Sequence, residues 1–315
     1  MTGYDGLRNA SAFLDLSRRG RIRVEGEDRA RLLHAMSTND VAQLAVGHGV
    51  YAFVLTAQGL ILADAYIYNL GDYLLLDTEP EVREKLFEHL DKYIIADDVT
   101  LEDEAERLSV VALEGPTTFE AAQKLGVPIP AGTLETVSYG TGFVAQVSST
   151  GSQGLRIFLP TAETLSLKSL LHTNGIPQAT PEEARVVRLE NGVPRYGEDI
   201  SERYLVQETQ QLTAVHFNKG CYLGQEIVER VRSRGQVHRL LTPVHIRATE
   251  APVPGTKLSD AGKDVAEITS AAYSPALGLV MALAYVRAEA LHSRPEMKVG
   301  SDPLSIAFIP AASVA

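Results

Sequence analysis

The segment from residue 218 to residue 240 contains the chain's single cysteine, at a position where a thiol can be reactive. Cys221 follows Lys219 and Gly220, and helical periodicity begins after Gly224. Backbone N–H groups and the dipole at a helix N-terminus favour a thiolate, and so does a neighbouring ammonium group. A lone cysteine is also often a buried, inert apolar residue. Position alone therefore leaves both interpretations of Cys221 open.

The same segment is basic in a chain whose net charge is −11. Residues 218–247 contain six Lys or Arg residues against two Glu residues. Arginine supplies forked donors that suit carboxylate and phosphate groups. An exposed helix with Glu226 and Arg230 four residues apart explains part of the pattern. A site for a small anionic ligand and a solvated helix face are both consistent with these arginines.

Asp64 interrupts a strand pattern that is otherwise apolar. In an alternating strand over residues 60–68, Leu62, Asp64 and Tyr66 share one face. Aspartate is disfavoured in strands, so its presence needs a reason. Asp64 is either a general acid or base, or an acceptor for a ligand amine, or a charge that protects an edge strand from aggregation.

Glu190 is a second carboxylate in an apolar pattern. Thr180, Pro181 and Glu183 predict a helix that begins with a capping box. On a helical wheel Glu190 falls between Val186 and Val187, so we expect it to point inward. Burying a carboxylate costs several kcal/mol unless it is paired. Glu190 therefore predicts either a structural salt bridge or a ligand with adjacent N–H donors.

Composition excludes several classes of protein. With 315 residues, 45% hydrophobic and 22% charged, the chain should fold into two or three domains, and its negative charge argues against nucleic-acid binding. One cysteine excludes an internal disulfide framework and cysteine-built metal centres, and fits a reducing compartment. We find no histidine spacing typical of metal ligands and no nucleotide-binding glycine motif. Neither a signal sequence nor a membrane-spanning run is evident, so we expect a cytoplasmic protein.

Hydrophobic periodicity predicts an α+β fold with antiparallel sheets. A strand and a helix over residues 21–36 precede three β-rich runs over residues 51–77, which are separated by turn dipeptides at hairpin spacing. Helices and strands then interleave without strict βαβ repetition. After residue 240, short apolar runs punctuated by proline and glycine predict a C-terminal β-barrel or sandwich.

The eight residues KGCYLGQE resemble the signature of the YgfZ-like folate-binding proteins, which are relatives of the glycine-cleavage T-protein, an aminomethyltransferase. The signature positions are Lys219, Gly220, Cys221, Tyr222, Gly224, Gln225 and Glu226. Blocks such as QGLILADAYIY and RLENGVPRYGED resemble the family in family order over nearly the whole chain. Two departures from the T-protein favour the YgfZ-like branch. Ala63 precedes Asp64 where T-proteins usually carry paired acidic residues, and T-proteins are longer and are not expected to contain this signature.

The resemblance implies a three-domain ring or cloverleaf with antiparallel sheets, a C-terminal β-barrel and a central cavity that holds tetrahydrofolate. We expect a discontinuous first domain over residues 1–48 and 106–235, a second domain over residues 49–105, and the barrel over residues 236–315.

The resemblance also implies the site residues. Glu190 would bind the pterin ring, with Tyr196 from the same block also binding the cofactor. Asp64 would lie near the folate nitrogens with a catalytic role. Arg230 and Arg239 would meet the glutamate tail of folate.

The function implied first is that of a tetrahydrofolate-binding accessory factor for the assembly or repair of iron–sulfur clusters in client enzymes, including tRNA-modifying ones. Cys221 would be its functional thiol, and turnover of a substrate stays open. The alternative is an aminomethyltransferase that moves a one-carbon unit from a lipoyl-bound aminomethyl group to tetrahydrofolate. A third hypothesis is a scaffold without a ligand, in which Glu190 is paired to an arginine.

Overall fold

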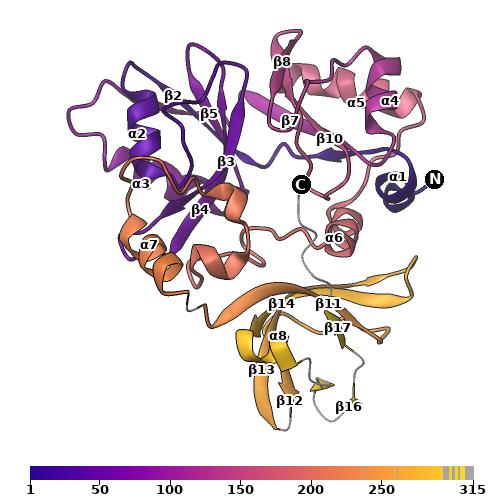
Figure 1. The fold of residues 1–315 in the computed structure, drawn as a ribbon. Coiled ribbons are helices and arrows are strands. Elements are labelled where there is room, and N and C mark those ends of the chain that lie inside the picture. Colours follow the sequence, from indigo (N-terminus) through magenta and orange to yellow (C-terminus); the bar gives the residue numbers. More distant parts are fainter. Residues whose placement is uncertain (236, 261, 294–297, 300–301, 304–305, 309–315) are drawn as a thin grey trace.

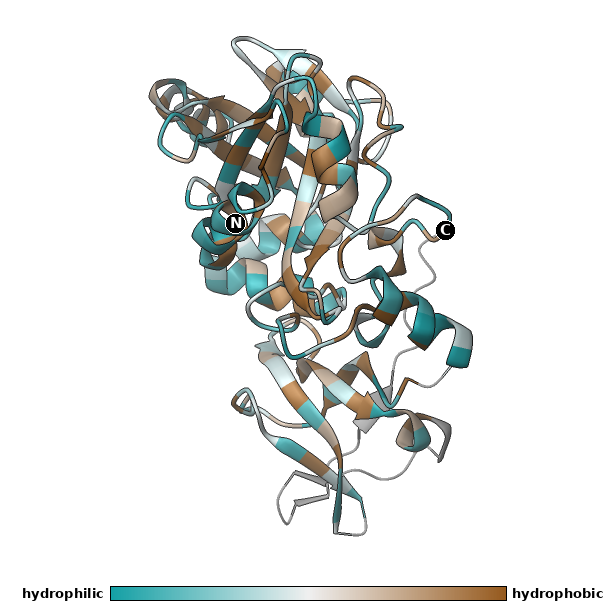
Figure 2. Cartoon of the chain, turned by 90° about the vertical axis from the view of Figure 1, so that its left-hand side faces the viewer, coloured by the Kyte–Doolittle hydropathy of each residue, from teal (hydrophilic) through white to brown (hydrophobic). Residues whose placement is uncertain are grey.

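The structure, a computed structural model, describes residues 1–235, 237–260, 262–293, 298–299, 302–303 and 306–308. Its elements form three lobes, two of which lie side by side above the third in Figure 1. Each lobe is built on an antiparallel sheet. In Figure 2 hydrophobic residues concentrate on the strands, and the loops are largely hydrophilic. The arrangement confirms the predicted α+β class with antiparallel sheets.

The first lobe contains a five-stranded sheet in the order β3-β4-β5-β2-β6. Gly59 and Gly71 have positive φ angles in the turns that follow β3 and β4, as the turn dipeptides predict. From the same part of the chain, two α-helices and a short 3-10 helix pack with this sheet. The elements are β2 (Gly20–Glu25), α2 (Arg29–Met36), β3 (Gly49–Leu55), β4 (Ile61–Asn69), β5 (Leu74–Thr78), η1 (Pro80–Val82), α3 (Arg83–Asp91) and β6 (Thr100–Asp103).

The second lobe contains a five-stranded sheet in the order β1-β7-β10-β9-β8. Helices α4 and α5 pack on it, and α1 precedes its first strand. The elements are α1 (Gly3–Asn9), β1 (Ala12–Asp15), β7 (Leu108–Glu114), α4 (Thr118–Leu125), β8 (Thr136–Tyr139), β9 (Gly142–Ala145), β10 (Gly154–Pro160), η2 (Thr161–Glu163) and α5 (Thr164–Thr173).

Helix α6 (Pro181–Glu190) connects the lobes. It begins with the predicted capping box between Thr180 and Glu183, and it contacts α1 of the second lobe and two strands of the third. The chain then returns to the first lobe through η3 (Val206–Thr209), η4 (Leu212–Ala214) and α7 (Gln225–Arg234). As a result α6 lies where the lobes meet (Figure 1).

The third lobe is a seven-stranded sheet in the order β16-β15-β12-β13-β14-β11-β17. Its long strands β13 and β14 form the hairpin that contacts α6. No helix in the described part of the chain is long and apolar enough to cross a membrane. The elements are β11 (Arg239–Ile246), β12 (Lys257–Asp260), β13 (Lys263–Ser274), β14 (Leu279–Arg287), α8 (Ala288–Ser293), β15 (Lys298–Val299), β16 (Asp302–Pro303) and β17 (Ile306–Phe308).

The sheets group the chain differently from the predicted domain boundaries. Those boundaries separate residues 1–48 from residues 49–105, yet β2 lies between β5 and β6 in one sheet. Residues 196–228 also contribute side chains to the core of the first lobe. Such pairings join segments that are far apart in sequence, and local periodicity contains no information about them.

Candidate functional site

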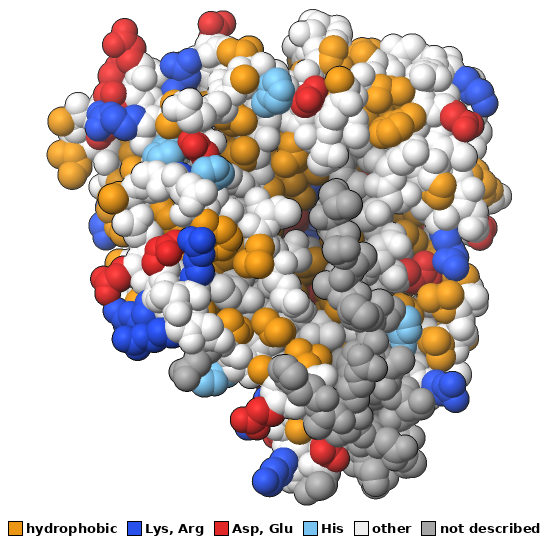
Figure 3. Space-filling model, viewed as in Figure 1, with side chains coloured by type: hydrophobic (Ala, Val, Ile, Leu, Met, Phe, Trp, Pro, Cys, Tyr) orange, Lys and Arg blue, Asp and Glu red, His pale blue; other side chains and the backbone are white. Residues whose placement is uncertain are grey.

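A cavity of about 910 Å³ lies between the first two lobes and the start of α6. Its wall combines Asp64 from β4, Arg156 from β10 and Arg188 from α6 with the segment that links β1 to β2. Figure 3 shows the surface hollowed between the two upper lobes. The volume lies within the range of about 300–1,000 Å³ that is usual for small-molecule sites.

Asp64 lies in the wall of this cavity with one carboxylate oxygen free. Its side chain is on β4, an interior strand, so the interpretation as an edge-strand charge is wrong. Asp64 is 8% exposed, and its Oδ2 accepts a hydrogen bond from the Tyr51 hydroxyl at 2.7 Å. The buried Oδ1 has no hydrogen-bond partner in the described structure.

Burial raises the pKa of Asp64 to about 6, and the negative charge of Glu79 adds to this effect. The hydrogen bond from Tyr51 and the charges of Arg19 and Arg156 act in the opposite direction. A carboxyl group with a pKa near 6 exists in both protonation states close to neutral pH. Asp64 can therefore accept or donate a proton, as the sequence suggested.

Beside Asp64, buried arginines and acids form a fixed charge network. Asp77 on β5 accepts hydrogen bonds from Arg19 Nε at 2.6 Å and from Arg156 Nη1 at 2.5 Å. Burial alone would raise the pKa of Asp77, but the charges of Arg19 and Arg156 outweigh it, so the pKa is lowered. The guanidinium group of Arg156 also lies over the Tyr66 ring, 4.5 Å from its centroid. Sequence reasoning missed this network because its members come from three distant segments.

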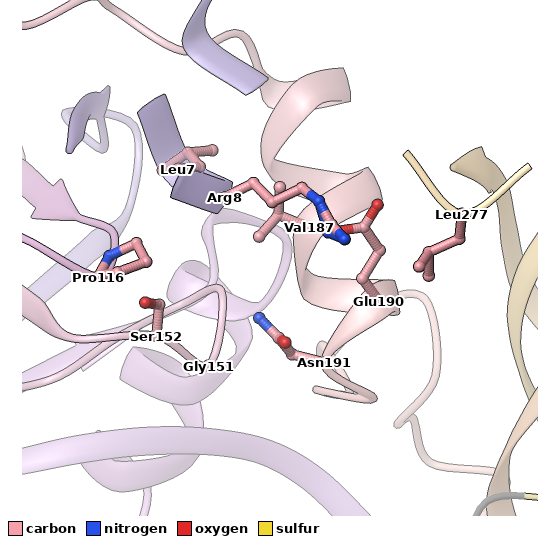
Figure 4. A pocket seen from close by; sticks show the side chains of 9 residues that line it. All are labelled: Leu7, Arg8, Pro116, Gly151, Ser152, Val187, Glu190, Asn191 and Leu277. Atoms are coloured by element: carbon pink, nitrogen blue, oxygen red, sulfur yellow. The ribbon is translucent and has the colours of Figure 1, made fainter. Parts of the chain in front are cut away.

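The side chain of Glu190 points inward as predicted and is 5% exposed, but it lines a second, smaller pocket of about 360 Å³. Its Oε1 accepts hydrogen bonds from the Tyr4 hydroxyl at 2.6 Å and from Ser274 Oγ at 2.5 Å. Its Oε2 accepts one from Arg8 Nη1 at 3.2 Å, and Figure 4 shows these two side chains pointing toward each other. The carboxylate is therefore satisfied by the protein itself, as the scaffold hypothesis requires.

The prediction that Glu190 lines the central cavity therefore needs correction. From α6 the larger cavity is lined by Arg188, by Arg185 one turn earlier, and by residues of the first turns of the helix, but not by Glu190. Glu190 follows Arg188 by two residues, which is about 200° around a helix. It therefore points to the opposite side of α6, toward α1 and the third lobe.

Tyr196 lines the larger cavity, as predicted for a binding residue. Its hydroxyl donates to the backbone carbonyl oxygens of Leu62 and, at 3.3 Å, Ile61. Tyr196 therefore holds β4 in place next to Asp64. Its ring can contact a ligand, whereas its hydroxyl is already hydrogen-bonded to the backbone of β4.

The two arginines predicted for the folate tail lie elsewhere. Arg230 is on α7, where it pairs with Glu226 at 2.5 Å, and Arg239 at the start of β11 pairs with Glu208 at 2.7 Å. The cavity wall contains Arg18 instead, which is exposed and forms no hydrogen bond or ion pair with any residue described. The adjacent arginines of the segment SRRGR are the only sequence signal that could have pointed to Arg18, and the family resemblance pointed to Arg230 and Arg239 instead.

The signature loop is fixed on the outside of the first lobe. Lys219 Nζ donates to the carbonyl oxygens of His34 at 2.5 Å, in the last turn of α2, and of Ser37 at 2.6 Å and Asn39 at 2.8 Å, just beyond it. Burial lowers the pKa of Lys219 to about 8. This clamp holds the loop that carries Cys221.

Cys221 itself is exposed, so the interpretation as a buried, inert cysteine is wrong. As predicted, it precedes a helix, since α7 begins after Gly224, whose φ is 81°. The described wall of the larger cavity consists of other residues, so the thiol and Asp64 occupy different places. Signature residues Tyr222 and Gln225 shape the turn, because the Tyr222 amide donates to Gln225 Oε1 at 3.0 Å.

Two sheet-based lobes and a third β lobe around a cavity with a buried carboxyl group define the fold of the T-protein class. Residues 4–219 match the model of the GCVT N-terminal domain, and residues 239–304 match that of the glycine cleavage T-protein C-terminal barrel domain, which confirms the predicted barrel. The chain belongs to the glycine cleavage T-protein family. Its membership of the YgfZ-like branch stays a prediction.

Individual relatives agree with this assignment. An aminomethyltransferase of Rubrobacter xylanophilus is 30% identical over 91% of this chain and 78% of the relative. A putative chloroplastic transferase of Arabidopsis thaliana is 28% identical over 95% of this chain and 70% of the relative. The crystal structure of the glycine cleavage system aminomethyltransferase T from Bartonella henselae has the same fold, with a TM-score of 0.88, 19% identity and coverage of 98% and 87% of the two chains.

Proposed function

We propose that this chain binds tetrahydrofolate in the larger cavity and acts there as an aminomethyltransferase, with Asp64 as the proton acceptor. The unpartnered Oδ1 of Asp64, buried in the cavity wall, is the observation that carries the proposal. The family and the names of several relatives support it. Glu190 does not support this proposal, because its carboxylate already accepts hydrogen bonds from Tyr4, Arg8 and Ser274.

The residues of the cavity fit the chemical groups of tetrahydrofolate. Tyr51 and Tyr66 provide aromatic surface for the pterin ring, and Asp64 Oδ1 is an acceptor for an N–H group of the ligand. Arg18 is a free cation for a carboxylate of the glutamate tail. The ion pairs of Arg19, Arg156 and the other wall arginines are already formed, so these residues shape the cavity instead of competing for the tail.

Asp64 supplies the proton chemistry that the transfer needs. When an amine nitrogen of folate forms a bond to the incoming one-carbon unit, that nitrogen must lose a proton. At pH 7.5 a carboxyl group with a pKa of about 6 is largely ionised and can accept this proton. Tyr51 orients the carboxylate through the hydrogen bond to Oδ2, which leaves Oδ1 without a protein partner and available to a ligand N–H group.

The test combines binding with turnover. Calorimetry should detect tetrahydrofolate binding by the wild-type chain, and incubation with an aminomethylated lipoyl carrier protein should release ammonia and form methylene-tetrahydrofolate. Asp64→Asn should abolish turnover, while Glu120→Gln, an exposed change on α4 away from the cavity, should keep it. Absence of binding, or turnover that survives in Asp64→Asn, would contradict the proposal.

A second candidate is the accessory role in iron–sulfur cluster assembly or repair, with cluster-containing client enzymes as partners. The exposed thiol of Cys221, on a loop held by Lys219, favours it because an aminomethyl transfer in the cavity does not use this thiol. Cys221→Ser should then fail to restore the activity of a cluster enzyme in a deletion strain. Full restoration by Cys221→Ser would remove the thiol from the mechanism. Either role suits a cytoplasmic protein, where a lone exposed thiol stays reduced.

A further inference from the structure

The cavity wall presents two carboxylates from neighbouring strands on the same face. In the antiparallel pair of β4 and β5, Tyr66 lies opposite Asp77. Continuing this register by two residues places Asp64 opposite Glu79, which follows the last residue of β5. Residues two apart on a strand point to the same side, and both carboxylates line the cavity.

A backbone contact fixes this juxtaposition. Thr78, the residue before Glu79, donates from Oγ1 to the carbonyl oxygen of Asp64 at 2.5 Å. The end of β5 is therefore held against β4 at the position of Asp64. The separation of the two carboxylates does not depend on a flexible loop.

The two carboxylates have different partners. Glu79 forms ion pairs with Arg19 and, at 2.9 Å, with Arg195, whereas Asp64 receives only a neutral hydrogen bond from Tyr51. Burial alone would raise the pKa of Glu79, but the charges of Arg19 and Arg195 outweigh it and lower that pKa. Glu79 is therefore ionised throughout the pH range in which Asp64 titrates.

We propose that Glu79 is a positioning residue that acts through Asp64: its charge, fixed by two arginines, lies across the strand pair from Asp64 and disfavours a second charge there, so that a proton taken up by the pair resides on Asp64. When the surroundings of two neighbouring carboxyl groups differ in this way, their pKa values move apart. One group then stays ionised, and the other binds and releases the proton. The consequence for catalysis rests on the proposed function, whereas the coupling between the carboxylates does not.

The other groups around Asp64 determine the size of the effect. Burial and Glu79 favour the protonated form, while Arg19, Arg156 and the Tyr51 hydrogen bond favour the carboxylate. The net result is a pKa of about 6. The titratable and charged groups that face Asp64 from the surrounding elements are Arg19, Tyr51, Tyr66, Glu79, Arg156 and Tyr196.

The test is a carbon-13 NMR titration of the full-length chain with labelled aspartate, without folate. The Asp64 signal is assigned by its loss in Asp64→Asn. Its midpoint should lie near 6 in the wild type and fall toward 3.8 in Glu79→Gln. Glu81→Gln is the matched control, because Glu81 also pairs with Arg195, at 2.6 Å, but is 49% exposed. The control midpoint should stay near 6.

An unchanged midpoint in folded Glu79→Gln would overturn the proposal. If that variant does not fold, labelled glutamate in the wild type provides the second measurement. The Glu79 signal should then show a small inflection at the midpoint of Asp64 that disappears in Asp64→Asn, and its absence would equally overturn the coupling. The titration is done without folate, so it is independent of tetrahydrofolate binding. If the pKa of Asp64 shifts in Glu79→Gln but the wild-type chain does not bind tetrahydrofolate, the coupling between the two carboxylates stands and only the proposed function is rejected.

Discussion

Replacing Glu190 distinguishes a structural role for this residue from a role in ligand binding. Its carboxylate accepts three hydrogen bonds, from Tyr4 and Arg8 at the N-terminus and from Ser274 in the third lobe. Glu190→Ala removes all of them and leaves Arg8 without its partner. We therefore expect the variant to lose the connection between α6, α1 and the β13–β14 hairpin, with no direct effect on the larger cavity.

The magnitude follows from the burial of the two partners. Breaking a buried ion pair by removing one partner costs about 3–5 kcal/mol. The side chain of Glu190 is 5% exposed, but that of Arg8 is 28% exposed and regains some hydration. We therefore expect Glu190→Ala to lower the free energy of unfolding by roughly 2–4 kcal/mol. Glu190→Gln keeps an acceptor for Tyr4 and Ser274 and should cost roughly 1 kcal/mol.

The assay pairs urea denaturation, followed by circular dichroism, with calorimetric titration of tetrahydrofolate. The urea midpoint should fall in Glu190→Ala, while the tetrahydrofolate Kd of Glu190→Gln should change by less than about threefold, which corresponds to under 1 kcal/mol. Glu120→Gln, an exposed change on α4 away from both pockets, should change neither quantity. A Kd that rises tenfold or more in Glu190→Gln at an unchanged urea midpoint would refute this reasoning and restore Glu190 as a ligand residue.

Three further predictions concern other residues. Because the pKa of Asp64 is about 6 in the folded state and 3.8 in the unfolded state, the folded state binds the additional proton, so the contribution of Asp64 to stability falls by roughly 2 kcal/mol as pH rises from 4 to 7; urea midpoints of the wild type and of Asp64→Asn should converge by this amount across the range. Lys219→Met leaves three carbonyl oxygens unsatisfied and should lower the free energy of unfolding by about 2–4 kcal/mol; an unchanged urea midpoint would disprove the clamp. Arg18→Gln should weaken tetrahydrofolate binding about tenfold but leave binding of a tail-less pterin unchanged, and equal loss for both ligands in calorimetry would reject its contact with the tail.

Local sequence signals predicted the elements near the site well. The turn dipeptides around Gly59 and Gly71 define the strand that carries Asp64, and the capping box at Thr180 defines the start of α6. Both signals depend on residues within one turn or one helix. The burial of Glu190 was equally predictable, because a helical wheel needs only the sequence of α6.

Such local signals could not predict contacts between segments that are distant in sequence. The partners of Glu190 are as many as 186 residues away, so the wheel could establish that it needs a partner but not which one. The pairing of β2 with β5 crosses the predicted domain boundary for the same reason. Glu79 was not predicted as a site residue because it lies one residue beyond β5. Only the register between β5 and β4 shows that it lies opposite Asp64.

A crystal structure of the complex with tetrahydrofolate tests the central claim most directly. We predict that the ligand occupies the larger cavity, with a folate nitrogen about 2.6–3.2 Å from Asp64 Oδ1 and the glutamate tail toward Arg18. Tetrahydrofolate bound against Glu190 in the smaller pocket, or held in the larger cavity without contact to Asp64, would contradict the account.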